Sequence, residues 1–141
     1  MINFFTEDVD LPFLNVSLVT EWLSSVCTAE KKELEEVSII FCSDEYLLDM
    51  NNEYLQHDYY TDIITFDYCV ENQIVGDLFV SVDRVKDNSI LNHVSFDNEL
   101  LRVIVHGVLH LIGFKDKTEE DAKLMRQKED EYLNLYVPRE T

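Results

Sequence analysis

The sequence predicts an α+β fold in which a small mixed four-stranded sheet is packed with about five helices. Two observations lead to this prediction. Apolar residues follow strand-like and helix-like patterns in the order β-α-β-α-β-β-α-α-α. The chain has 141 residues, 46% of them hydrophobic, with only 3 Gly and 2 Pro, so it can fill one core and has little material for linkers. We therefore expect residues 1–141 to form a single domain.

The first part of the chain is predicted to alternate strands with helices. Ile2–Phe5 reads as a short strand, and the β-branched run Val37–Cys42 reads as a buried one. Asn15 caps a helix that runs to about Ala29, and Ser43 caps a second one. The inner faces of these two helices are predicted to carry Val16, Val19, Leu23, Val26 and Cys27, and Leu47, Met50 and Tyr54, respectively.

The second part is predicted to hold two more strands and then three helices. The strands are Thr61–Phe66 and Asp77–Val82, with a turn between them, and a short helix follows over Asp83–Leu91. Leu100–Ile112 is apolar nearly all round, which is typical of a helix inside a core. Ser95 caps that helix, Gly113 ends it, and Thr118 opens the last helix, whose inner face is predicted to carry Met125, Tyr132 and Tyr136.

Charge and composition limit the partners and the compartment. Eleven Lys and Arg against 29 Asp and Glu give a net charge of −18, which should repel a polyanion on average. No segment approaches the roughly 18 apolar residues of a membrane span, and the acidic start of the chain does not resemble a signal peptide. Three cysteines without metal-type spacing read as reduced core thiols, namely Cys27, Cys42 and Cys69. We expect a cytoplasmic protein that contacts no membrane.

Five of the eleven basic residues fall close together near the end of the chain: Lys115, Lys117, Lys123, Arg126 and Lys128. They form either a patch that faces a nucleic acid or one solvated helix face of mixed charge, since Glu119, Glu120 and Asp121 lie among them.

The segment that indicates chemistry is His106 to Asp116. His106 and His110 are four residues apart, so their rings lie on one helical face and can converge on a metal ion. Gly113 permits a left-handed turn, after which Asp116 could supply a third ligand. This spacing matches metzincin-type zinc sites and predicts one zinc per chain. The alternative is two core histidines, each with its own buried acceptor, and a surface aspartate before a helix. His93 reads as a surface or capping residue.

Gly107 separates this segment from zinc peptidases. In the H-E-x-x-H pattern, a glutamate general base follows the first histidine. Glycine has no side chain, so the standard peptidase mechanism loses its base here. A metal-bound water remains the expected nucleophile, and the sequence identifies no general base for it.

The segment H-G-V-L-H-L-I-G-F at 106–114 resembles the H-G-x-L-H-L-x-G-Y-D-H signature of the YbeY family of ribosomal RNA maturation factors. Further upstream, 52–54, Asp58, 61–66 and 76–77 resemble that family's N-x-x-Y-R, D-x-P-T-[DN]-V-L-S-F and G-D segments in order and spacing. The resemblance covers essentially the whole chain. It implies a bacterial cytosolic endoribonuclease that processes single-stranded RNA, chiefly small-subunit ribosomal RNA, and acts in ribosome quality control.

The family pattern holds zinc through three histidines, and this sequence departs from it. His106 and His110 match the first two, whereas Asp116 stands at the third, with Lys115 before it in place of an aspartate. Carboxylate is also a zinc ligand, so metal binding is still expected. Leu55 stands in place of a family arginine that, by the resemblance, contacts a substrate phosphate, and Tyr60 stands in place of a proline.

We therefore predict a zinc-dependent endoribonuclease whose partners are a ribosomal RNA precursor and, in addition, ribosomal or assembly proteins. The candidate substrate contacts are His57, Thr61, Asp62, Lys115 and Lys117. His57 either replaces the missing arginine or is an exposed loop histidine, and Thr61 and Asp62 either line the site or begin a strand. Two alternatives stay open: a zinc metallopeptidase or amidohydrolase, and a non-catalytic, metal-stabilised ribosome-assembly factor that binds proteins.

Overall fold

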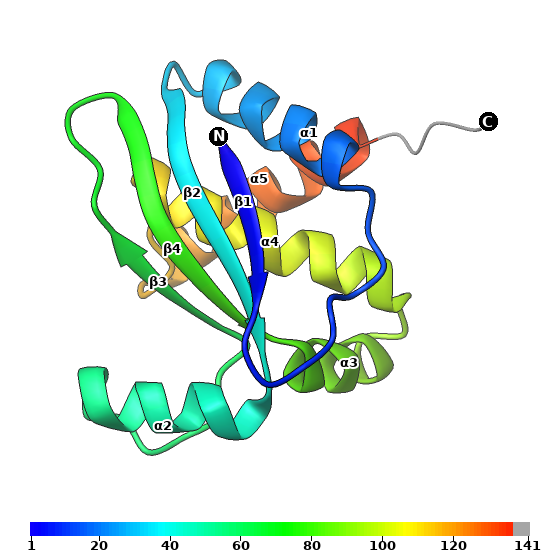
Figure 1. The fold of residues 1–141 in the computed structure, drawn as a ribbon. Helices are drawn as coiled ribbons and strands as arrows, with labels where there is room; N and C mark the ends of the chain where they lie inside the picture. Colours follow the sequence, from blue (N-terminus) through cyan, green and yellow to red (C-terminus); the bar gives the residue numbers. More distant parts are fainter. Residues whose placement is uncertain (137–141) are drawn as a thin grey trace.

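The computed structural model describes residues 1–136, and these form four strands and five helices in the predicted order (Figure 1). The elements are β1 (Ile2–Thr6), α1 (Val16–Ala29), β2 (Glu33–Cys42), α2 (Asp44–Leu55), β3 (Ile63–Asp67), β4 (Gln73–Ser81), α3 (Val82–Leu91), α4 (Phe96–Ile112) and α5 (Glu119–Leu135). The α+β prediction is confirmed. Within the described part of the chain, no helix is long and apolar enough to cross a membrane.

The sheet is mixed, with strand order β1-β2-β4-β3. β1, β2 and β4 run parallel, and β3 pairs antiparallel with β4 from Ile63 opposite Val80 to Asp67 opposite Gly76. β3 is therefore an edge strand. Because the parallel strands need crossovers, α1 connects β1 to β2, and α2 with β3 lies between β2 and β4.

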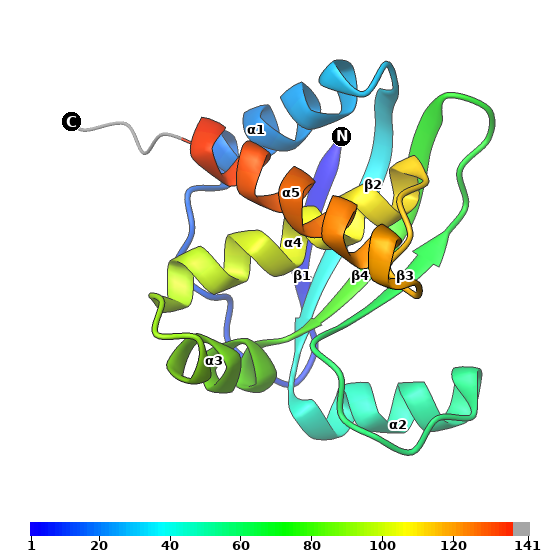
Figure 2. The same ribbon diagram turned by 180° about the vertical axis from the view of Figure 1, so that it is seen from behind.

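The helices form layers on the sheet. Seen from behind, α5 lies outermost, and α4 lies between α5 and the sheet (Figure 2). The main apolar cluster joins α1, α4 and α5 to one sheet face, and a smaller cluster under α2 covers part of the other face with Cys42, Leu47 and Ile64. The prediction that α4 is buried is confirmed: Ile104, Val105 and Val108 are 0% exposed.

Two glycines allow backbones in this core to approach closely. A Cβ atom on Gly107 of α4 would lie 2.6 Å from Ile63 Cδ1 and 3.0 Å from a methyl group of Leu78. One on Gly76 of β4 would lie 2.6 Å from the backbone oxygen of Phe66. These contacts place α4 directly against β3 and β4.

Helix starts were predicted well because capping side chains mark them. Asn15, Ser43, Ser95 and Thr118 each accept a hydrogen bond from the backbone N–H three residues on. Ser81 caps α3 in the same way.

Strand starts and some helix faces were predicted less well. β2 begins at Glu33 and β4 at Gln73, each four residues early, because these polar residues pair with each other. Val16 and Tyr54, expected on inner faces, are 42% and 61% exposed. Tyr136 lies just past α5 and packs edge-on against Trp22. Residues 137–141 of the predicted single domain lie outside the described residues.

Candidate metal centre

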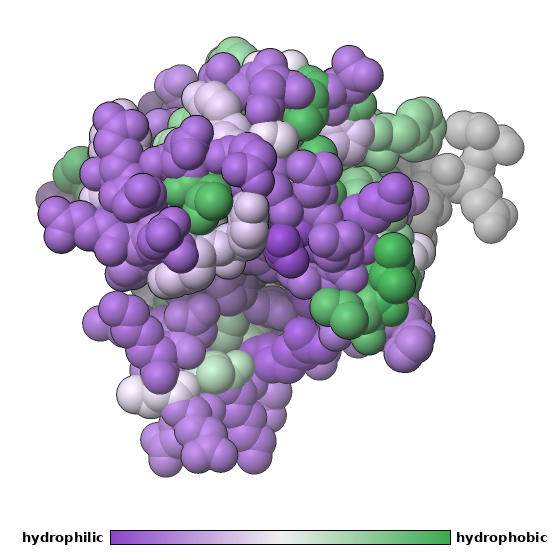
Figure 3. Space-filling view, turned by 90° about the horizontal axis from the view of Figure 1, so that it is seen from below, coloured by the Kyte–Doolittle hydropathy of each residue, from purple (hydrophilic) through white to green (hydrophobic). Residues whose placement is uncertain are grey.

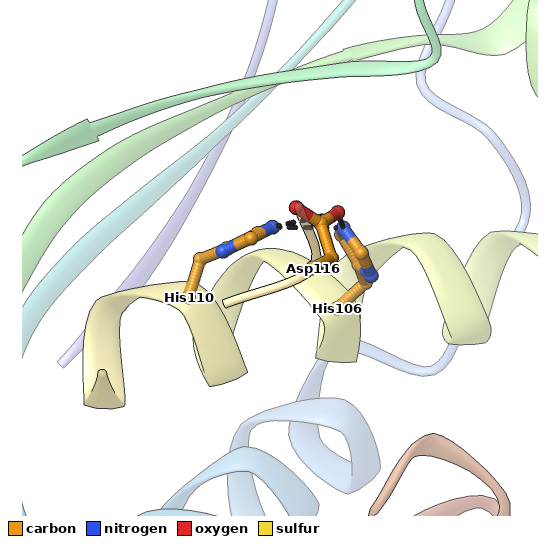
Figure 4. Close-up of side chains that lie close together, drawn as sticks. All are labelled: His106, His110 and Asp116. Carbon is orange, nitrogen blue, oxygen red and sulfur yellow. Dashed lines mark hydrogen bonds and ion pairs between the residues drawn. The ribbon is translucent and has the colours of Figure 1, made fainter. Parts of the chain in front are cut away.

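α4 and the loop after it bring His106, His110 and Asp116 together (Figure 4). The Nε2 atoms of the two histidines are 3.0 Å apart. Gly113 then ends α4 at φ 126°, a conformation that favours glycine, and turns the chain back. As a result, the Oδ2 atom of Asp116 lies 3.3 Å from each Nε2.

Hydrogen bonds at the far side of each ring fix which nitrogen faces the centre. The Nδ1–H of His106 donates to Oε2 of Glu129 at 2.6 Å, and the Nδ1–H of His110 donates to the backbone carbonyl of Phe114 at 3.0 Å. A carboxylate and a carbonyl can only accept, so both protons are assigned to Nδ1. Two Nε2 lone pairs and the Asp116 carboxylate then face one another with no donor between them.

Such an arrangement of acceptors fits a cation. A tetrahedral ion with bonds of 2.0–2.1 Å separates its ligand atoms by about 3.3 Å, and the three separations here are 3.0, 3.3 and 3.3 Å. Two imidazole nitrogens and one carboxylate oxygen are also a donor set typical of zinc. The residues present therefore fit a tetrahedral metal ion without rearrangement.

Charged neighbours favour a proton on His106 in the metal-free protein. Burial by itself lowers the pKa of this imidazole, but the hydrogen bond and negative charge of Glu129, together with Asp116, outweigh burial and raise that pKa above its ordinary value. A proton and a metal ion therefore compete for the same nitrogen.

Glu129 is the functional residue that the sequence analysis missed. It lies on α5, is 5% exposed, and its Oε1 accepts a hydrogen bond from Nη1 of Arg102 at 2.9 Å. Nη2 of Arg102 also donates to Asp130 at 2.7 Å. The signal was present in the sequence, since Glu129 lies four residues after Met125 and three before Tyr132, on the buried face of α5.

The metal centre opens into a cleft of about 520 Å³ between α4, β3 and the loop after α2. Its walls include the two histidines, Asp116 and Lys117. Ten further residues complete them, namely Asn51, Leu55, His57, Tyr59, Thr61, Asp62, Ile63, Ile64, Thr65 and Asp67. Four of the five candidate substrate contacts thus lie in one cleft, and Lys115 is not among the residues that line it.

The cleft residues differ in their surroundings. His57 stacks on Tyr59 with ring centroids 5.1 Å apart, and its Nδ1 shares a hydrogen bond with the Tyr59 hydroxyl at 3.0 Å. Thr61 and Asp62 line the cleft, and they do not begin the strand as the sequence had suggested, because β3 starts at Ile63. Burial raises the pKa of the Asp62 carboxyl, and the charge of Glu129 adds to that rise.

The basic residues do not act as one patch. Lys128 Nζ bonds Glu30 at the end of α1 at 2.9 Å and lies over the ring of Phe114, so this half-buried ammonium is already paired. Arg126 approaches Glu129 at 3.9 Å. The exposed surface is mostly hydrophilic, as Figure 3 shows for one face. His93 is exposed and follows α3 with φ 56°, outside the cleft.

Comparison with known proteins identifies the family of this chain. The family model described as "Endoribonuclease YbeY" matches residues 2–137. The chain belongs to the YbeY family. Curated YbeY endoribonucleases of Flavobacterium johnsoniae and Cytophaga hutchinsonii are 52% and 50% identical to it, covering 96% and 95% of this chain and 97% and 94% of theirs. The solution structure of a Thermotoga maritima protein is similar over 95% of this chain and 87% of that one, with TM-score 0.67 and 26% identity.

Proposed function

We propose that this YbeY-family chain is a zinc-dependent endoribonuclease that cleaves single-stranded RNA in small-subunit ribosomal RNA maturation and in ribosome quality control. One observation carries the proposal. Two imidazole lone pairs and a carboxylate converge at the wall of an open cleft, in a chain whose relatives are named endoribonucleases.

His106, His110 and Asp116 would hold one zinc ion. When bound, zinc supplies Lewis acidity, which stabilises charge on a phosphodiester oxygen and makes water a better nucleophile. The chain's contribution is orientation: the hydrogen bonds from Nδ1 to Glu129 and to Phe114 keep both rings turned toward Asp116. The three metal ligands are therefore already in place before the ion binds.

The cleft offers contacts for a nucleotide chain. The stacked rings of His57 and Tyr59 present a flat surface on which a base can stack. The Lys117 ammonium lines the same cleft and can donate to a phosphate oxygen, and so can the Thr61 hydroxyl once it releases the backbone carbonyl of Ile63, to which it donates at 3.3 Å. Leu55, at the position of the family arginine, also lines the cleft but supplies no charge. Among the described residues that line the cleft, the ammonium group is therefore that of Lys117.

Different features bear on the two alternative functions, a zinc peptidase and a non-catalytic assembly factor. A peptidase needs a carboxylate beside the first histidine, and a side chain at Gly107 would meet Ile63 and Leu78 of the sheet. An assembly factor that only binds basic proteins is favoured by the net charge of −18. Such ribosomal or assembly proteins are compatible with the enzyme as additional partners.

The test compares metal content with cleavage. Purified chain should contain about one zinc, measured by mass spectrometry, and should cut an end-labelled single-stranded RNA in preference to a duplex or to casein. His106→Ala and His110→Ala should lose both zinc and cleavage. His93→Ala is the matched control, since it removes an exposed histidine outside the cleft, and should keep both. RNA cleavage that persists unchanged in the two site variants would refute the proposal.

A further inference from the structure

The two histidines of the metal centre are held by unequal partners. His110 donates to a neutral backbone carbonyl at 3.0 Å, whereas His106 donates to the Glu129 carboxylate at 2.6 Å. A hydrogen bond to a charged acceptor is shorter and roughly twice as strong as a neutral one. His106 is therefore the ring whose orientation depends on an ionised side chain, and that side chain comes from a different helix.

Glu129 is itself fixed in place. Its side chain is 6% exposed, and Arg102 of α4 bonds the oxygen that His106 does not use, at 2.9 Å. The guanidinium pairs with the buried carboxylate, and it orients Oε2 toward Nδ1 of His106. Arg102 and His106 lie four residues apart on α4, so one face of that helix presents both partners to Glu129.

We propose that Glu129, held by Arg102, is a positioning residue for the metal centre, which acts through His106 and couples α5 to the metal ligands on α4. This inference rests on the metal-binding part of the proposed function. Glu129 does not touch the ion or the substrate. Its carboxylate holds the proton on Nδ1, so that the Nε2 lone pair stays directed at Asp116 and at the ion. It also makes the imidazole a more basic ligand.

The test measures zinc affinity by competition with a chromophoric chelator, not RNA cleavage. Glu129→Gln keeps the size of the side chain but removes its charge, and it should weaken zinc binding by roughly ten- to a hundredfold. Glu131→Gln is the matched control, because it removes one negative charge from the exposed side of the same helix, where Glu131 meets only Lys128 among the ion pairs of the described residues. Its zinc affinity should stay within about twofold of the wild type.

A second readout separates positioning from a general loss of structure. At a pH above the pKa of His106, where the ring is neutral, ring ¹⁵N spectra of the metal-free proteins should show His106 protonated on Nδ1 in the wild type and as a mixture of tautomers in Glu129→Gln. His110, which keeps its carbonyl acceptor, should not change. Circular dichroism confirms that each variant is folded at the temperature of the titration.

Arg102→Met completes a double-mutant cycle. It should weaken zinc binding less than Glu129→Gln does, and adding it to Glu129→Gln should have little further effect, because both changes act on one network. Additive losses would overturn the role of Arg102. Wild-type affinity in Glu129→Gln, or an equal loss in Glu131→Gln, would overturn the role of Glu129. A wild-type chain that binds zinc but cuts no RNA would refute the proposed enzyme and leave this inference standing.

Discussion

Replacing Gly107 by alanine tests why the position after the first histidine carries no side chain. The added Cβ would lie 2.6 Å from Ile63 Cδ1 and 3.0 Å from a Leu78 methyl group. Leu78 is 0% exposed, so its side chain is enclosed by the core, while Ile63 lines the cleft. Overpacking of this kind costs about 1–3 kcal/mol. Alanine gains roughly 1 kcal/mol over glycine in helix propensity.

The overpacking cost should win, with a net destabilisation of about 1 kcal/mol and a fall in Tm of roughly 2–6 °C for a domain of this size. Thermal unfolding is followed by circular dichroism with a chelator present, so that zinc does not contribute to Tm. Gly76→Ala is the comparison, because its Cβ would meet the backbone oxygen of Phe66, which cannot rotate away. It should cost more. A Tm that rises in Gly107→Ala would show that the methyl group fits, and that close approach to the sheet does not explain the glycine.

Three further predictions concern the metal and the RNA. Asp116→Ala should bind zinc more weakly than the wild type, and Asp116→His should keep the metal and move the alkaline rise of activity to lower pH, since a third neutral ligand leaves the site more positive. A profile that stays unshifted in a zinc-loaded Asp116→His would contradict the charge argument. Zinc affinity should fall on acidification, beginning above about pH 6.5, because the pKa of His106 is raised and zinc must displace its proton. Chelator competition at a series of pH values measures this affinity. A zinc affinity that does not change down to about pH 6 would contradict the prediction. Neutralising Lys115 and Lys117 together should flatten the salt dependence of RNA binding, and because Lys117 alone lines the cleft, Lys117→Gln should account for most of the change.

The fold could be predicted because helix caps and apolar periods are local signals. Asn15, Ser43, Ser95 and Thr118 each form the cap that the pattern indicated. The polar first halves of β2 and β4 could not be found in this way, because Glu33 and Gln73 are strand residues only by virtue of pairing with each other. Tyr54, which has helical spacing with Leu47, is nevertheless exposed and meets the sheet only with its ring edge-on against Phe66 of the edge strand β3.

The candidate site likewise has a part that local sequence signals predict and a part that depends on tertiary packing. The spacing of His106, His110 and Asp116 is local, and the structure brings these three together. Glu129 is brought to His106 by the way α5 crosses α4, which no short pattern describes. A charged residue on a predicted amphipathic helix is ordinarily assigned to solvent, yet this one lies on the apolar face, and a buried carboxylate requires a partner. Reading α5 for charges on its inner face would have singled it out.

The charge of the cleft links the metal to the choice of substrate. Its described walls carry three carboxylates, on Asp62, Asp67 and Asp116, and one ammonium, on Lys117. A phosphodiester would be repelled by this set, in keeping with the net charge of −18. A divalent cation held by Asp116 would balance the formal charge of these walls. We therefore expect metal binding to be a condition for admitting RNA as well as for cutting it, which would explain how so acidic a protein acts on a polyanionic substrate.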